Sequence, residues 1–246
     1  MATNVEIKEK NAVGETVSVV IQALLLALII RSFLFQPFSI PSGSMKPTLL
    51  VGDYVFVSKW SYGFSRHSFP FSPNLFSGRI WGGDPARGDV AVFKYPPDPS
   101  KDYIKRVIGL PGDKIQLKDT VVLVNGTPIP RAPAGEFTGR YRGQTITVPT
   151  FTETMANGRS YEMMDVEANS SGDTTGVFEV PAGHYFFMGD NRDNSADSRY
   201  DVGMVPAENL VGKAQVIFLS LADETPAWHF WRWPSDMRWG RLFTGL

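Results

Sequence analysis

Cysteine is absent from this chain of 246 residues. Its absence excludes a disulfide framework, a thiol nucleophile, an iron–sulfur cluster and zinc bound through thiolates. Histidine is scarce as well, with only His67, His184 and His229, so a histidine-rich metal site is not expected. An excess of positive charge is also missing, since 24 Lys and Arg stand against 25 Asp and Glu, which argues against a nucleic-acid partner.

Long apolar runs are missing except for one near the N-terminus. Residues 17–30 read VSVVIQALLLALII, with twelve apolar residues in fourteen. Because a spanning helix needs about 20 residues, we predict a transmembrane anchor over 13–35, with Glu15 and Arg31 near the two headgroup layers. A cleavable signal peptide and a buried core helix are the alternatives, although no small-x-small cleavage pattern follows the run.

The charges beside this run bear on its orientation. Lys8 and Lys10 favour a cytoplasmic N-terminus, whereas Arg31 on the other side weakens that preference. We therefore expect a single-pass protein with a cytoplasmic tail over 1–12 and an extracytoplasmic domain over 36–246.

Beyond the run, the sequence has the pattern of a turn-rich β protein. Pro37 and Pro41 end any helix that leaves the membrane, and 23 Gly with 18 Pro suit many turns. Asn125-Gly126 is the signal of a type I′ hairpin. Segments rich in Val, Ile, Tyr and Phe predict strands at Tyr54–Ser58, Val90–Phe93, Tyr103–Leu110, Val121–Val124, His184–Met188 and Gln215–Leu219.

Two aromatic segments and one polar segment have no clear role in this pattern. Residues 62–82 form an insertion of Gly, Ser, Pro and Phe, and residues 131–176 are polar with weak strand signals. Near the C-terminus, four of the six Trp lie among arginines: Trp228, Trp231, Trp233 and Trp239. This tail either folds back onto the domain or lies in the headgroup layer, and the sequence leaves both readings open.

With no thiol, a catalytic nucleophile has to be a hydroxyl. The three histidines lie in the insertion, at the start of a strand and in the Trp-rich tail, and no G-x-S-x-G motif occurs. The remaining activator is a lysine whose pKa burial lowers far below about 10.4. Lys105 lies inside an apolar strand-like run and fits this demand, whereas Lys46 lies on a turn and is expected to stay hydrated and protonated.

A rigid turn supplies candidate serines. Residues 40–49 read IPSGSMKPTL, in which Pro and Gly favour a turn that exposes a serine and its backbone N–H, as an oxyanion hole requires. Taken alone, any single serine or lysine is far more often ordinary surface.

Four ordered motifs and the apolar run together resemble the bacterial type I signal peptidases. The motifs are SGSMKPTL at 42–49, RGDVAVFKYP at 87–96, DYIKRVIGLPGD at 102–113 and GDNRDNSADSR at 189–199. That family consists of membrane-bound Ser/Lys endopeptidases that remove signal peptides from exported preproteins. The resemblance covers the anchor and most of 36–114 and 183–216.

The resemblance implies a mainly β fold: a transmembrane helix, then a catalytic domain of signal-peptidase type with a smaller β insertion at 115–182. It implies the bacterial cytoplasmic membrane as the location. The expected partners are signal peptides of preproteins, membrane lipid and, transiently, the protein-export channel. No cofactor and no metal are expected.

Residue roles follow from the same resemblance. Ser44 matches the nucleophile, and Lys105 matches the general base of both acylation and deacylation. Ser42 and the Ser44 N–H match the oxyanion hole, and Ser195 matches the residue that orients the Lys105 amine. In the family, shallow apolar pockets accept the small residues of an Ala-x-Ala motif. The residues that match the positions lining these pockets are Phe38, Ile40, Met45, Leu49, Tyr103, Ile104 and Ala196.

The GDNRDNSADSR motif also contains Asp197 and Arg199, which match a supporting ion pair. Its acidic residues do not follow the calcium-loop pattern, because Arg192 occupies the third position and Ser195 replaces the required glycine. Asp190 and Arg192 are therefore interpreted as turn and scaffold residues.

Three other functions compete with this interpretation. A Ser/Lys peptidase of the same fold with one dedicated substrate would carry the same motifs. A self-cleaving repressor also uses such a dyad, but the anchor disfavours it. An anchored β domain that acts as an assembly factor, with its dyad a relic, is the non-enzymatic alternative.

Overall fold

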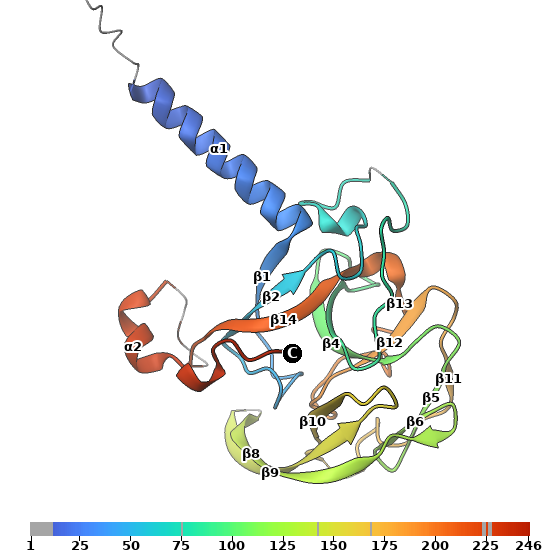
Figure 1. Ribbon diagram of the computed structural model, residues 1–246. Coiled ribbons are helices and arrows are strands. Elements are labelled where there is room, and N and C mark those ends of the chain that lie inside the picture. Colours follow the sequence, from blue (N-terminus) through green and yellow to red (C-terminus); the bar gives the residue numbers. More distant parts are fainter. Residues whose placement is uncertain (1–11, 75, 142, 168, 223–224, 226–227) are drawn as a thin grey trace, which may run out of the picture.

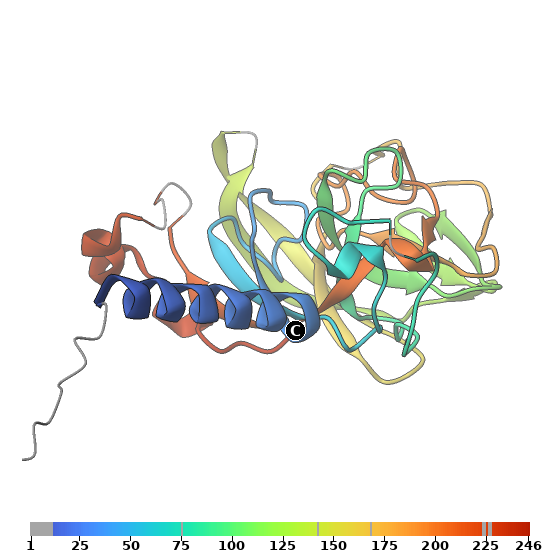
Figure 2. The ribbon, with the colours of Figure 1, turned by 90° about the horizontal axis from the view of Figure 1, so that it is seen from above.

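A computed structural model describes residues 12–74, 76–141, 143–167, 169–222, 225 and 228–246. The expected cytoplasmic tail thus lies almost entirely outside the described residues. Helix α1 (Ala12–Phe33) covers most of the anchor predicted over 13–35, and Phe35 already belongs to the first strand. It projects away from a β-rich body (Figures 1 and 2), and its apolar side chains are exposed, as Leu24 at 65% illustrates. This exposure excludes a buried core helix.

The length of α1 suits a membrane span. Its 22 residues extend about 33 Å at about 1.5 Å per residue, close to the thickness of a bilayer core. Beyond it, the described residues contain only one further α-helix, α2 (Trp233–Asp236), besides short 3-10 turns. The prediction of a mainly β protein is confirmed.

Seven strands form the main sheet, in the order β1-β2-β14-β3-β4-β12-β13. Their bounds are β1 Phe35–Ser39, β2 Asp53–Ser58, β3 Val90–Lys94, β4 Asp102–Gly109, β12 His184–Met188, β13 Val205–Pro206 and β14 Leu210–Ser220. The predicted strands all occur here or in the smaller sheets, with ends shifted by a few residues. Strand β1 was missed because Pro37 suggested an irregular segment; it pairs only with β2, at the sheet edge, where a missing N–H is tolerated.

Two smaller sheets are built from the chain between β4 and β12. One has the order β11-β5-β6-β7 and the other β10-β9-β8. Their bounds are β5 Lys114–Lys118, β6 Val121–Val124, β7 Thr127–Pro128, β8 Arg131–Tyr141, β9 Gln144–Thr154, β10 Ser160–Met164 and β11 Phe178–Glu179. Asn125 and Gly126 both have positive φ, as the predicted type I′ turn between β6 and β7 requires.

The strand signals in 131–176 were underestimated. Strands β8 and β9 have 11 residues each and form a long hairpin at the end of the molecule remote from α1 (Figure 1). Many of their side chains are exposed and polar, so the hydrophobic alternation that marks a strand in the sequence is weak here.

The loop after β1 is held by the core of the main sheet. Ile40, Met45 and Leu49 are buried in one apolar cluster with side chains of β2, β3 and β14. Since Ile40 is buried before the turn, Met45 within it and Leu49 after it, the backbone between Ile40 and Leu49 is fixed by packing.

The C-terminal tail folds back onto this same region. Phe243 N–H donates to the Ile217 carbonyl, and Arg241 forms an ion pair of 2.6 Å with the buried Asp53. Trp231 and Trp239 nevertheless remain more than 60% exposed. The tail therefore combines a docked backbone with indole rings that face outward.

Candidate active site

Ser44 and Lys105 meet between the loop after β1 and the strand β4. The Nζ atom of Lys105 lies 2.7 Å from the Oγ atom of Ser44 and 2.9 Å from the Ile104 carbonyl oxygen. Both side chains are buried, although 61 residues separate them in sequence. A candidate nucleophile and a candidate base therefore lie within hydrogen-bond distance of each other. This is the arrangement that activation of a hydroxyl requires.

The surroundings of Lys105 favour the neutral amine. Burial lowers the pKa of Lys105 from 10.5 to about 8, and the carboxylates of Asp197 and Asp190 oppose this change without cancelling it. The Tyr103 ring lies 5.5 Å from Nζ. A lysine with such a pKa is partly unprotonated near neutral pH, so it is able to accept a proton from a hydroxyl.

The turn that carries Ser44 presents two further donors. Ser42 Oγ lies 3.4 Å from Ser44 Oγ, and Ser42 is exposed whereas Ser44 is buried. The Ser44 N–H donates to no residue that the structure describes. A hydroxyl and a free N–H beside the nucleophile match the geometry of an oxyanion hole.

Asn191 fixes the carbonyl groups of this turn, a role that the sequence did not reveal. Its Nδ2 donates to the Gly43 carbonyl at 3.1 Å, and its N–H donates to the Ser44 carbonyl at 3.1 Å. Gly189 lies against the same turn, where a Cβ atom would be 2.5 Å from the Ser44 carbonyl oxygen. Both residues belong to the GDNRDNSADSR motif, so its first residues position the nucleophile.

The structure brings the predicted pair Asp197 and Arg199 together. Arg199 Nε lies 3.0 Å from Asp197 Oδ1, and Nη2 lies 2.9 Å from Oδ2, with both side chains almost fully buried. Asp197 Oδ2 also accepts from the Gly189 N–H. The hydroxyl of Ser195 is buried and hydrogen-bonded to no described residue, so its contact with the Lys105 amine stays a prediction.

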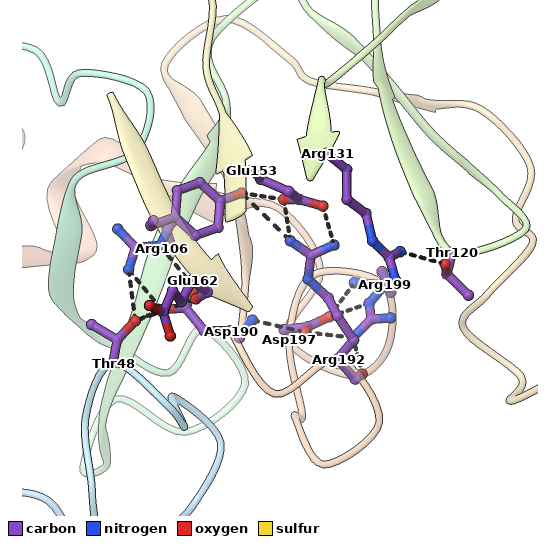
Figure 3. Close-up of polar contacts among 12 residues, drawn as sticks. Thr48, Arg106, Thr120, Arg131, Glu153, Glu162, Asp190, Arg192, Asp197 and Arg199 are labelled. Atoms are coloured by element: carbon purple, nitrogen blue, oxygen red, sulfur yellow. Dashed lines mark hydrogen bonds and ion pairs between the residues drawn. The ribbon is translucent and has the colours of Figure 1, made fainter. Parts of the chain in front are cut away.

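Arg106, next to Lys105 on β4, joins three segments of the site. Its guanidinium forms a two-point contact with Asp190, at 2.7 and 2.6 Å, and donates to the Gly88 carbonyl. Thr48, from the serine turn, donates to the same Asp190 carboxylate at 2.6 Å. Figure 3 shows this cluster, which connects β4, the serine turn and the GDNRDNSADSR motif.

A second buried ion pair connects the motif to the insertion. Arg192 contacts Glu153 of β9 at 3.0 and 2.5 Å, and Tyr161 of β10 donates to Glu153 at 2.5 Å (Figure 3). Both Arg192 and Glu153 are almost fully buried. Nothing in the sequence singled out Glu153, because it lies in the part of the chain that matched no motif.

A cleft of about 360 Å³ opens beside the dyad. Of the predicted pocket residues, Tyr103, Ile104 and Ala196 line it, together with Pro41, Ser42, Ser44, Asp102, Lys105 and Asn194. Ile40, Met45 and Leu49 lie in the core beneath the turn, and Phe38 lines a separate cavity.

Lys46 does not stay hydrated, so that expectation is wrong. It is 6% exposed, and its Nζ donates to the Arg140 carbonyl on β8 at 2.9 Å. The side chain crosses from the serine turn to the long hairpin, whereas Ser44 is hydrogen-bonded to Lys105.

One group of described carboxylates is close enough to hold a cation. The oxygens of Asp165, Asp173 and Asp193 lie within 4.8 Å of one another. Both oxygens of Asp173 already accept from Ser170, and burial together with Asp193 raises the pKa of Asp165 to about 6. The group is therefore best described as a hydrogen-bonded acid cluster.

Comparisons with known proteins identify several proteins that are similar to this chain. A family model described as "Signal peptidase, peptidase S26" matches residues 13–219. Signal peptidase I of Rickettsia typhi is 48% identical over 204 residues, which are 79% of this chain and 76% of that protein. The Rickettsia prowazekii enzyme is 46% identical over 203 residues, again 79% and 76%. A solved signal peptidase I from Enterococcus faecalis gives a TM-score of 0.32 at 26% identity and covers 53% of this chain and 97% of that chain.

Proposed function

This chain belongs to the signal peptidase I family, serine peptidases of family S26 that cleave signal peptides, and we propose that it acts through an acyl-enzyme on Ser44 with Lys105 as the general base. The observation that carries the proposal is the 2.7 Å contact between Lys105 Nζ and Ser44 Oγ. The lowered pKa of Lys105, about 8, supports it further.

In the first step, the neutral amine of Lys105 accepts the Ser44 hydroxyl proton while Oγ attacks the scissile carbonyl carbon. The oxygen of the tetrahedral intermediate receives hydrogen bonds from the Ser42 hydroxyl and the Ser44 N–H. When the C–N bond breaks, the Lys105 ammonium returns its proton to the leaving amine, and the ester on Ser44 remains.

In the second step, Lys105 takes a proton from water, and the resulting hydroxide attacks the ester carbonyl. Collapse of the second intermediate breaks the bond to Ser44 Oγ, which recovers a proton from Lys105. The signal peptide leaves with a carboxylate at its new C-terminus. We propose that the buried ion pair of Asp197 and Arg199 supports the segment beneath the dyad. We also propose that the buried Ser195 hydroxyl, which has no partner among the described residues, turns toward the Lys105 amine and orients it.

We further propose an Ala-x-Ala-like preference at the cleavage site. Side chains of an extended substrate alternate, so the first and third residues before the scissile bond face the same wall of the cleft. That wall includes Tyr103, Ile104 and Ala196, in a cleft of about 360 Å³. Its limited size favours small side chains at both positions.

The site also has to lie near a membrane. Ser44 lies nine positions after Phe35, so the nucleophile stays within about 30 Å of the end of the predicted anchor. We propose that the anchor crosses the bacterial cytoplasmic membrane, with the N-terminus inside and the site outside, close to the export channel.

Cysteine labelling tests this orientation, because the chain has no Cys of its own. Ser160→Cys should react with an impermeant maleimide on intact cells, whereas Thr3→Cys should react only after permeabilisation.

The central experiment incubates the full chain in detergent with preproteins that carry Ala-x-Ala signals. The parent and Ser160→Ala, a surface control, should cut after the motif, whereas Ser44→Ala and Lys105→Ala should not. Cleavage by a folded Lys105→Ala variant would overturn the base assignment. Cleavage of only one preprotein in a panel would instead indicate a dedicated-substrate peptidase.

A further inference from the structure

A second cavity lies where α1 enters the β-rich body. It has a volume of about 440 Å³, and its walls come from segments far apart in the chain. These are the last turn of α1, strand β1, the loop after the 3-10 turn Arg66–Ser68, and the facing parts of β3 and β4. In Figure 1, this loop lies beside the end of α1. The lining groups that matter here are Arg31, Gln36, His67, Phe69, Lys94 and Asp102.

Positive charge exceeds negative charge in and behind this cavity. Lys94 Nζ lies 2.9 Å from Asp102, the one carboxylate of the lining. Arg31 is exposed and forms no hydrogen bond or ion pair with any residue that the structure describes. Behind the wall, Lys59 is 1% exposed, and its Nζ donates to the Ser68 carbonyl at 3.2 Å. The three cations Arg31, Lys59 and Lys94 thus lie near a cavity whose lining has a single carboxylate, that of Asp102.

The cations also act on one another. Burial lowers the pKa of Lys59 to about 8. Asp102 opposes this change, whereas the charges of Arg31, Lys94 and Arg79 add to the lowering. The pKa of His67 falls to about 4, first through burial and then through Arg66 and Lys94, so His67 is neutral at physiological pH. An anion in the cavity would relieve this repulsion, since an opposite charge stabilises each protonated group.

Aromatic side chains gather beside the cavity, around the C-terminal end of the apolar helix α1. Phe33 of α1 packs against Phe69 with ring centroids 5.6 Å apart, and Phe35 packs against Trp60 at 4.5 Å. Phe71, on the rim of the cavity, is fully exposed. Trp and Tyr are enriched at the membrane–water boundary, and Trp60 stands with these Phe rings at the end of the apolar helix. The anion present at that depth is the phosphate of a phospholipid.

We propose that this cavity binds the phosphate of an anionic phospholipid, with Arg31 and Lys94 as its ligands and the acyl chains along Phe69 and Phe71. Arg31 offers a planar pair of N–H donors that suits phosphate oxygens, and Lys94 supplies a point charge. Gln36 adds an amide donor from the adjacent wall.

Binding at this place would set the position of the catalytic cleft relative to the bilayer. Asp102 lines both cavities, and it precedes Lys105 by three residues on β4. At about 3.3 Å per residue, the bound phosphate would lie roughly 10 Å along the strand from the base. The lipid proposal stands on the cavity alone and does not require that the cleft cleaves signal peptides.

The test measures lipid selectivity of the full chain. The protein is reconstituted into phosphatidylcholine bilayers that contain a trace of spin-labelled phosphatidylglycerol or spin-labelled phosphatidylcholine, and the motionally restricted fraction is compared. The wild type should select phosphatidylglycerol. Removal of each cationic side chain should weaken the preference for phosphatidylglycerol over phosphatidylcholine by about fivefold. The double variant Arg31→Gln/Lys94→Gln should therefore show almost no preference.

Two control variants separate the cavity from overall charge and from folding. Lys114→Gln/Lys118→Gln removes two exposed charges on β5 and should keep the selectivity. Arg31→Lys/Lys94→Arg keeps the charge of the cavity and should retain most of the effect. Circular dichroism checks that all variants are folded.

Three results would overturn the proposal. One is a wild type without selectivity, and another is an Arg31→Gln/Lys94→Gln variant that keeps it. The third is displacement of the labelled lipid by millimolar inorganic phosphate, which would identify a site for free phosphate. If lipid selectivity is unchanged but the same variant raises KM for a preprotein in detergent, the cavity belongs to the preprotein and the lipid assignment is wrong.

Discussion

The catalytic rate of this peptidase should follow the deprotonation of Lys105, so pH is the perturbation that tests the site most directly. Only the neutral amine accepts the Ser44 proton. Burial lowers the pKa of Lys105 from 10.5 to about 8, against the opposing effect of Asp197. Protonation below that pKa should therefore abolish the base without disturbing the contact between the two side chains.

The expected size of the effect follows from this pKa. At pH 7, about one Lys105 amine in ten is neutral, compared with about one in 3,000 for a pKa of 10.5. The value of kcat/KM should rise about tenfold from pH 6 to pH 7, reach half its maximum near pH 8 and level off above pH 9.

The assay measures kcat/KM from pH 6 to pH 10 for the full chain in detergent, with a preprotein that has no titratable side chain beside the cleavage site. Lys101→Met removes an exposed lysine near the start of the same strand and should leave the midpoint unchanged. A flat profile between pH 6 and pH 8, or a midpoint near 10, would refute the reasoning.

The same lowered pKa reduces the stability of the folded protein. Between pH 8 and 10.5 the unfolded chain holds a proton that folded Lys105 has lost, so the free energy of unfolding rises with pH in this window. Below pH 8, the lowered pKa reduces the free energy of unfolding by about 3 kcal/mol. The free energy of unfolding of Lys105→Met at pH 7 should therefore exceed that of the parent by up to about 3 kcal/mol. Thermal unfolding in detergent should show this advantage shrinking between pH 8 and 10.5, and a difference that is independent of pH would contradict it.

Three further substitutions test other parts of the site. Ser42→Ala should lower kcat by about 10²–10³-fold at unchanged stability, because one oxyanion donor is lost; an unchanged kcat would remove Ser42 from the mechanism. Gly189→Ala should lower kcat about 100-fold, since its Cβ would press on the turn of the nucleophile, whereas Gly176→Ala, which meets no neighbour within 4 Å, should cleave like the parent. Glu153→Gln should cost about 3–5 kcal/mol in urea unfolding because it leaves Arg192 buried without its counter-charge, and a loss below about 1 kcal/mol would show that the pair is dispensable.

Local sequence patterns predicted most of the main sheet. β-branched and aromatic runs located β2, β3, β4, β12 and β14 to within a few residues, except at the N-terminal end of β14, and the Asn125-Gly126 pair located a hairpin. Such enrichment works because β-branched and aromatic side chains suit a buried pleated surface, and β3 and β12 are buried along almost their whole length. They failed for β1, which contains Pro37, and for the long hairpin β8–β9, whose side chains are largely exposed.

The candidate site was predicted unevenly. Motif resemblance located Ser44, Lys105, Asp197 and Arg199, and the structure brings them together as two close pairs. It did not foresee that Met45 lies in the core, because burial on a turn depends on what packs against it.

The sequence alone establishes the inventory: no thiol, one long apolar run at the centre of the predicted span, and four motifs in a fixed order. The environment of each residue depends on the tertiary structure. The pKa of Lys105 depends on the protein atoms that displace water around it, and the partner of Arg192 comes from a strand 39 residues away. Desolvation and long-range ion pairs arise when distant segments pack together, so no local pattern of residues encodes them.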